Sequence, residues 1–251
     1  MGDRRSAILE YVIERERVDV GDLADRFAVS QVTIRKDLDH LERQGLVHRE
    51  HGFAVAMAPD DLRSRLAYHH DQKRRIAAAA AGLVTSGDTV MIESGSCCAL
   101  LAAELAATKR GVTIVTNSAF IADYVRASAG TAVVLLGGDY QAESQVTVGP
   151  LAEQCLAGFH VGQLFAGIDG YTPQTGFTAR NHLRAAVVKA MAGRADRVIL
   201  LTESAKFSRQ GAVPLLDAAA VDQVVTDAGL PGALRAGLAA AGIALTLVPV
   251  E

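Results

Sequence analysis

Apolar residues in the first 44 positions recur at the three- and four-residue spacing that marks amphipathic helices. The pattern predicts a first helix with Ile8 and Val12 on its buried face, and a second helix with Leu23 and Phe27. A short break at Ala28-Val29 then leads into a third helix.

The third predicted helix has the clearest boundaries. Ser30 suits its N-cap, because the hydroxyl oxygen can accept a hydrogen bond from a free backbone N–H. Ile34, Leu38 and Leu41 follow at i, i+4 and i+7 and form one apolar stripe. Gly45 is expected to end the helix in a left-handed conformation.

From residue 46 to 56 apolar and polar residues alternate around Gly52, which predicts a small β-hairpin. Helix, tight turn, helix and hairpin in this order form a winged helix-turn-helix, a fold that binds DNA. Short amphipathic helices also occur in proteins that bind no DNA, so the periodicity alone leaves both alternatives open.

The exposed side of the third helix is the candidate DNA-binding surface. If its apolar stripe is buried, Arg35, Lys36 and Asp39 point outward. The first turns of a recognition helix meet base edges and phosphates, and a basic side chain on the wing can reach a phosphate. The residues predicted to contact DNA are Ser30, Gln31, Thr33, Arg35, Lys36, Arg49 and His51.

After about residue 88 the rhythm changes to short Val/Ile/Leu-rich runs that alternate with alanine-rich amphipathic stretches. This is the βα pattern of a mostly parallel open sheet, so the predicted fold class is α/β after an all-α-type winged helix. We expect a winged helix-turn-helix over 1–57, a linker or short connecting helix over 58–72, and an α/β sensor domain over 73–251. The strand-like runs are Thr89–Ile92, Val112–Val115, Ala132–Leu136, Gln163–Ala166, Val198–Leu201 and Gln223–Val225.

Small and polar residues follow these runs, where an open parallel sheet binds its ligands. Gly95-Ser96 stands between a strand and a helix, so its backbone N–H groups can hold an anion. Thr116-Asn117-Ser118 repeats the arrangement, Gly137-Gly138 allows close backbone approach, and Lys206 adds a positive charge. Together these groups suit a phosphorylated sugar, although each alone is an ordinary turn, loop or surface lysine.

The net charge of −3 does not favour nucleic-acid binding, and the first 52 residues hold nine Lys and Arg against eleven Asp and Glu. DNA binding must therefore rest on local placement of positive charge. No apolar run approaches the roughly 18 to 20 residues of a membrane span, and no signal peptide precedes the first helix, so a cytoplasmic protein is expected. The three cysteines lack zinc spacing and no GxxxxGK[ST] run is present, so neither a metal nor a cofactor is expected.

The run VSQVTIRKDL from Val29 to Leu38, followed by LERQGLVHREHG, resembles the N-terminal signature of the DeoR family of bacterial regulators. Lys36 replaces a more frequent arginine, which keeps the charge but loses the bidentate fork. Phe53 stands where a second glycine is usual. The matching residues are Ser30, Thr33, Ile34, Arg35, Asp37, Leu38, Leu41, Glu42, Gly45, Arg49, His51 and Gly52.

The C-terminal part resembles the sensor domain of the same family, from Lys73 to Asp227. The resemblance implies a fold related to ribose-5-phosphate isomerase, glucosamine-6-phosphate deaminase and CoA transferase-like proteins. It also implies an effector site. The predicted effector-binding residues are Ser94, Gly95, Ser96, Cys97, Thr116, Asn117, Gly137, Gly138, Asp169, Thr178, Arg180 and Lys206.

Arg184 stands where many relatives have a glutamate, and we expect it to lie at i+4 from Arg180 on one helix. The pair suggests either a more anionic effector or a salt bridge from Arg184 to another subunit. The role of Glu203 is left open.

These observations predict a DNA-binding repressor of a sugar or carbohydrate operon that a phosphorylated sugar relieves, acting as a dimer or tetramer on double-stranded operator DNA. One alternative is an isomerase- or deaminase-like enzyme, in which Glu93, Asp169, Glu203 or Asp227 acts as general base. No histidine–acid arrangement accompanies them, and a winged helix has no use in such an enzyme, so no catalytic residue is assigned. The other alternative is a winged helix that binds a protein partner, which the exposed polar and basic residues of the third helix disfavour.

Overall fold

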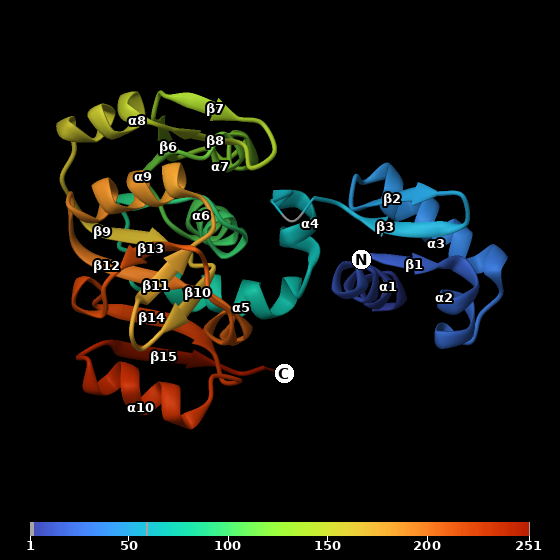
Figure 1. Ribbon diagram of the computed structural model, residues 1–251. Coiled ribbons are helices and arrows are strands. Elements are labelled where there is room, and N and C mark those ends of the chain that lie inside the picture. Colours follow the sequence, from blue (N-terminus) through green and yellow to red (C-terminus); the bar gives the residue numbers. More distant parts are fainter. Residues whose placement is uncertain (1–2, 59, 251) are drawn as a thin grey trace. The chain divides into compact units, whose positions relative to one another are not determined.

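The computed structural model describes residues 3–58 and 60–250. The chain forms two compact units, one reaching to His70 and one starting at Asp71 (Figure 1). The predicted linker over 58–72 contains α4 (Leu62–Ala67) and the start of α5 (His70–Ala81), and its exact limits stay a prediction. Residues 1, 2, 59 and 251, which the predicted domains and linker include, lie outside the described residues.

The N-terminal unit has the predicted order of helices and hairpin, with one additional strand. Arg17–Asp19, for which no strand was predicted, forms β1, which pairs antiparallel with β3. The strands form one sheet in the order β1-β3-β2. The elements are α1 (Asp3–Arg15), β1 (Arg17–Asp19), α2 (Val20–Phe27), α3 (Gln31–Arg43), β2 (Val47–Glu50) and β3 (Phe53–Ala56).

The boundaries of α3 confirm the sequence prediction. The hydroxyl of Ser30 accepts a hydrogen bond from the backbone N–H of Thr33 at 3.2 Å, which caps the helix. Gly45, just after the helix, has φ +69°. His51 and Gly52 both have positive φ and form the two-residue turn of the β2–β3 hairpin.

Asp37 lies on the buried side of α3, although its neighbours there are apolar. Its carboxylate accepts hydrogen bonds from Arg4 Nε at 2.7 Å and Arg5 Nε at 2.9 Å, and these bonds tie α1 to α3. Burial alone would raise the pKa of Asp37, but the hydrogen bonds and charges of Arg5 and Arg4 outweigh it and hold the pKa below its ordinary value of 3.8.

Replacing Asp37 by asparagine is expected to lower the free energy of unfolding of the N-terminal unit by about 1–2 kcal/mol, because both arginines stay partly in solvent. The ion pairs stabilise the fold above pH 3.8, and this contribution is lost as the pH falls through the lowered pKa. Hydrogen exchange of α1 and α3 peptides, at neutral pH and near pH 3, measures both effects. Exposed Asp39→Asn is the control, and an equal loss of protection in both variants would contradict the prediction.

The C-terminal unit contains a parallel sheet of seven strands in the order β15-β14-β12-β9-β4-β5-β6. The six predicted runs all lie in this sheet, which confirms the mostly parallel α/β fold, whereas the strand β15 was missed. No described helix has the length and apolar character needed to cross a membrane. The sheet strands are β4 (Thr89–Ile92), β5 (Val112–Thr116), β6 (Thr131–Leu135), β9 (Val161–Ala166), β12 (Ala195–Leu201), β14 (Gln223–Asp227) and β15 (Ala244–Val248).

Helices join these strands, and two small antiparallel sheets lie beside them. Neither small sheet was predicted. The helices are α6 (Ser96–Thr108), α7 (Ala119–Tyr124), α8 (Pro150–Cys155), α9 (His182–Ala192) and α10 (Gly232–Ala240). One small sheet pairs β7 (Asp139–Gln141) with β8 (Val146–Val148), and the other has the order β10-β11-β13, from Gly170–Thr172, Gly176–Ala179 and Val213–Leu216.

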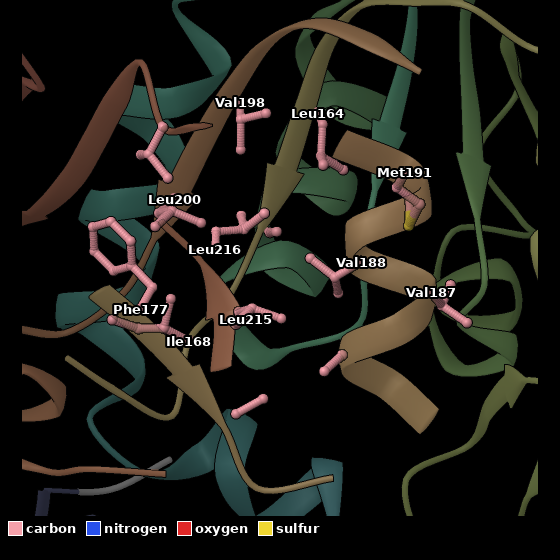
Figure 2. Packing of buried hydrophobic residues seen from close by; sticks show 14 of the residues in the cluster. Leu164, Ile168, Phe177, Val187, Val188, Met191, Val198, Leu200, Leu215 and Leu216 are labelled. Carbon is pink, nitrogen blue, oxygen red and sulfur yellow. The ribbon is translucent and has the colours of Figure 1, made fainter. Parts of the chain in front are cut away.

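Both faces of the central strands are buried. Phe165 and Ile199 alternate along β9 and β12 with the residues of the main core and are buried as well, which explains the nearly continuous apolar runs. Figure 2 shows the core between the sheet, α9 and β13. Its labelled residues include Leu164, Val188, Met191, Val198, Leu200, Leu215 and Leu216.

The strand order changes direction at β4. The chain proceeds from β4 to β5 and β6 on one side, then returns to place β9 and β12 on the other. Right-handed crossovers in these two directions put α6 and α9 on opposite faces of the sheet (Figure 1). In such sheets ligands bind beyond the carboxyl ends of the strands at this switch point, here the ends of β4 and β9.

Candidate functional sites

The N-terminal part of α3 presents its polar side chains to solvent. Ser30, Gln31, Arg35 and Lys36 are exposed, and Thr33 is half-buried beside the Ser30 hydroxyl. Arg35 Nη2 donates to Gln31 Oε1 at 3.3 Å, one helical turn earlier. The structure therefore brings the five predicted α3 residues together at one end of the helix.

The wing residues are in a different situation. Arg49 Nη1 forms an ion pair with Asp39 on α3, and the Arg49 backbone N–H donates to Glu42 Oε1 at 2.9 Å. His51 is exposed at the hairpin turn. Asp39 therefore competes with a phosphate for the Arg49 guanidinium, a competition that the sequence did not indicate.

The end of β4 leads into α6 through Glu93, Ser94 and Gly95. Gly95 has φ +147°, a backbone conformation that residues other than glycine rarely adopt, and as the N-cap residue it has no side chain of its own to cap the helix. The helix of 13 residues begins at Ser96, so its first backbone N–H groups lie at the positive end of the helix dipole. Ser96 and Cys97 are buried.

Glu93 joins the two strands at the switch point. Its Oε1 accepts from the Ser94 hydroxyl at 2.7 Å, and its Oε2 accepts from the Gly167 backbone N–H, just after β9, at 3.2 Å. The side chain is buried. Sequence reasoning assigned Glu93 only to the enzyme alternative, although its position directly after a buried strand was the signal that places it here.

Thr116 and Asn117 lie fully buried at the end of the neighbouring strand β5. Thr116 Oγ1 accepts from the Ser118 N–H at 3.0 Å, and Asn117 Nδ2 donates to the Thr147 carbonyl at 3.1 Å. Among the residues that the structure describes, Asn117 Oδ1 finds no hydrogen-bond donor. A buried acceptor of this kind is suited to a ligand hydroxyl.

Asp169, which follows β9, gathers two cationic side chains. Lys206 Nζ lies 3.4 Å from Asp169 Oδ1, and Arg180 Nε lies 3.8 Å from the same oxygen. Buried Thr178 connects this group to the chain at Gly211. Its hydroxyl oxygen accepts a hydrogen bond from the Gly211 N–H at 2.8 Å, and its carbonyl oxygen accepts one from the Asp169 N–H at 2.9 Å. The structure thus brings four of the predicted effector residues together.

The expectation that Arg180 and Arg184 share one helix is wrong. Arg180 precedes α9, and its backbone N–H donates to Asp169 Oδ2 at 3.0 Å. Asn181 is the N-cap and accepts from the Arg184 N–H at 3.1 Å, so the helix begins between the two arginines. An asparagine between two basic residues was the available signal for this boundary. The role of Arg184 stays a prediction.

Gly138 has a packing reason for being glycine, whereas a side chain at Gly137 would make only an ordinary van der Waals contact. A Cβ on Gly138 would lie 2.6 Å from the Val148 carbonyl oxygen and 3.0 Å from the Ala152 Cβ, so the chain here fits closely against β8 and α8. A Cβ on Gly137 would meet Cys155 Sγ at 3.7 Å. A part of both glycines in effector binding stays a prediction.

A buried ion pair, which the sequence did not predict, lies at the end of β12. Lys73 Nζ on α5 lies 3.3 Å from Glu203 Oε2, with 2% of the lysine residue exposed. The apolar neighbours Ile76 and Ala77 pack on the same side of α5 as Lys73, at i+3 and i+4, so its position on the buried face could be inferred but its partner could not.

The N-terminal unit matches the DeoR-like helix-turn-helix domain over residues 4–59, and residues 68–228 match the DeoR C-terminal sensor domain. The chain is 31% identical to the putative aga operon transcriptional repressor of Escherichia coli O157:H7, over 98% of this chain and 93% of that protein. It is 28% identical to the L-fucose operon activator of Haemophilus influenzae, over 94% and 95% of the two chains. These relatives are transcriptional regulators and not enzymes.

Among solved structures, ribose 5-phosphate isomerase A of Methanocaldococcus jannaschii is similar over 55% of each chain, with 19% identity and a TM-score of 0.40. A similarity this slight supports no conclusion about function.

Proposed function

The chain belongs to the DeoR family of DNA-binding transcriptional regulators, and from that premise we propose that it represses genes of sugar metabolism until a phosphorylated sugar binds its sensor domain. The proposed operator contacts are the exposed residues at the start of α3 and the basic residues of the wing. The proposed effect on transcription is repression, although the relatives include both a repressor and an activator.

The observation that carries the effector proposal is the start of α6 at the strand switch point, where the N-cap is Gly95 and brings no side chain to the helix end. Helix N-termini hold phosphate through their backbone N–H groups and the positive end of the helix dipole. Asn117 Oδ1 and the buried Glu93 carboxylate, at the ends of β5 and β4, supply acceptors for sugar hydroxyls. A helix start that suits an anion and neighbouring acceptors that suit hydroxyl groups together favour a sugar phosphate over a neutral sugar.

We expect the active species to be at least a dimer. The N-terminal unit carries no excess of positive charge, so a single copy would bind one half-site weakly. Two copies on a repeated operator add their binding energies. An effector can release them only if it binds better to a state whose half-site spacing does not fit.

The test measures binding of the full-length protein to DNA upstream of its own gene, with unrelated DNA as competitor, at one fixed salt concentration. We expect sequence-specific binding that one member of a panel of sugar phosphates weakens at least tenfold. The same compound should raise the thermal unfolding temperature, while its unphosphorylated sugar should not. Equal effects of both compounds would refute the phosphate claim, and the absence of specific DNA binding would refute the operator claim.

A further inference from the structure

Val32 is exposed on the first turn of α3, with 59% of its surface in solvent. Among the described side chains from Arg4 to His70, it is the only large hydrophobic residue in this condition. Val32 is not among the residues that the sequence predicts to contact DNA. Single exposed apolar residues are common on protein surfaces, so exposure alone does not indicate a function for Val32. Its position on α3 has to be considered as well.

Val32 lies on the DNA-facing side of α3. Residues at i, i+3, i+4 and i+7 share one face of a helix, so Val32 aligns with Arg35, Lys36 and Asp39. All four are exposed, while Ile34 and Leu38 on the opposite side are fully buried. The apolar side chain of Val32 therefore lies at the N-terminal end of the exposed face that also carries Arg35 and Lys36.

The folded structure gives this position no reason to be valine. A β-branched residue loses side-chain freedom in a helix, and alanine, glutamate or lysine would stabilise an exposed helical position better. Val32 is also absent from the hydrophobic core of the N-terminal unit, whose described members include Ile34, Leu38 and Leu41. The fold of the free protein therefore does not explain an apolar group at this position.

We propose that Val32 packs against the C5-methyl group of a thymine in the major groove, and so makes this regulator prefer thymine at one position of each half-site. The proposal rests on operator binding through α3. Valine has no donor or acceptor, and the thymine methyl is the apolar group that base edges present in the major groove. Gln31 and Arg35, on either side, supply the polar contacts to neighbouring bases.

The experiment starts from an operator selected from random duplex DNA by the full-length protein. Each thymine is then replaced in turn by uracil, which removes the methyl group and keeps every hydrogen-bonding group. For the natural protein we expect a three- to tenfold loss of affinity at one position of each half-site, as for burying a single methyl group. For Val32→Ala, the thymine and uracil operators should bind equally at that position.

Lys36→Ala is the matched control, because it removes a phosphate contact from the same face and should keep the thymine preference. Thermal unfolding of Val32→Ala should occur at the same temperature as for the natural protein or slightly higher, since the side chain is exposed and alanine favours the helix. A uracil penalty of the same size in both proteins, or no penalty at any thymine, would overturn the inference and leave operator binding intact. Failure to select any DNA sequence would overturn both this inference and the proposed function.

Discussion

Replacing Lys73 by methionine is expected to lower the free energy of unfolding of the C-terminal unit by about 3–5 kcal/mol. The lysine is 2% exposed and its partner Glu203 is 8% exposed, so the substitution removes a cation from beside a buried carboxylate. Charge burial of this kind costs far more than the loss of an exposed pair, because water cannot replace the missing partner.

Hydrogen exchange of peptides from α5 and β12 in the full-length protein measures the effect separately from the N-terminal unit. Arg74→Met is the matched control, since Arg74 is the exposed neighbour on the same helix and its loss should cost less than about 0.5 kcal/mol. The double variant Lys73→Met/Glu203→Leu should recover most of the stability, because it removes both charges. Equal losses for Lys73→Met and Arg74→Met would contradict the prediction.

Arg35→Ala is expected to weaken binding to the selected operator by about 10- to 100-fold, equivalent to about 1–3 kcal/mol, and to weaken non-specific binding much less. The side chain is exposed at the start of α3, and its hydrogen bond to Gln31 leaves other guanidinium donors for a guanine edge. Fold stability should be unchanged, since the residue makes no core contact.

Fluorescence anisotropy with operator and random duplexes, at one salt concentration, gives the two affinities. Arg126→Ala on the sensor unit controls for the change in net charge, because its side chain is 71% exposed. Lys36→Ala should weaken both duplexes alike and lower the salt slope by about 1, as expected for a phosphate contact. An Arg35→Ala variant that weakens both duplexes equally would show that Arg35 contacts phosphate and no base.

Features that depend on neighbouring residues were predictable from the sequence, whereas features that depend on contacts between distant segments were not. The boundaries of α3 were predictable because Ser30 and Gly45 act on the backbone within one turn of their own positions. The central strands were predictable because burial on both faces requires continuous apolar runs. By contrast, β10, β11 and β13 were not predictable. They are short, and the strands that pair lie up to about 40 residues apart in the chain.

The candidate sites divide in the same way. The places of the predicted effector residues at the ends of β4, β5 and β9 followed from the predicted strands that precede them, whereas the start of α9 between Arg180 and Arg184 depended on a single capping asparagine. The place of Glu93 directly after β4 could be seen in the sequence, but its hydrogen bond to Gly167, just after the distant strand β9, could not.

By itself, the sequence determined the helix-turn-helix, the parallel sheet and the polar residues at its edge, because helix caps and hydrophobic periodicity act over a few neighbouring residues. Only the tertiary structure decided which charges meet: Asp37 with Arg4 and Arg5, Arg49 with Asp39, and Lys73 with Glu203. It also decided that Val32 stays in solvent. Ion pairing and burial depend on distances between segments far apart in the chain, and local patterns carry no information about those distances.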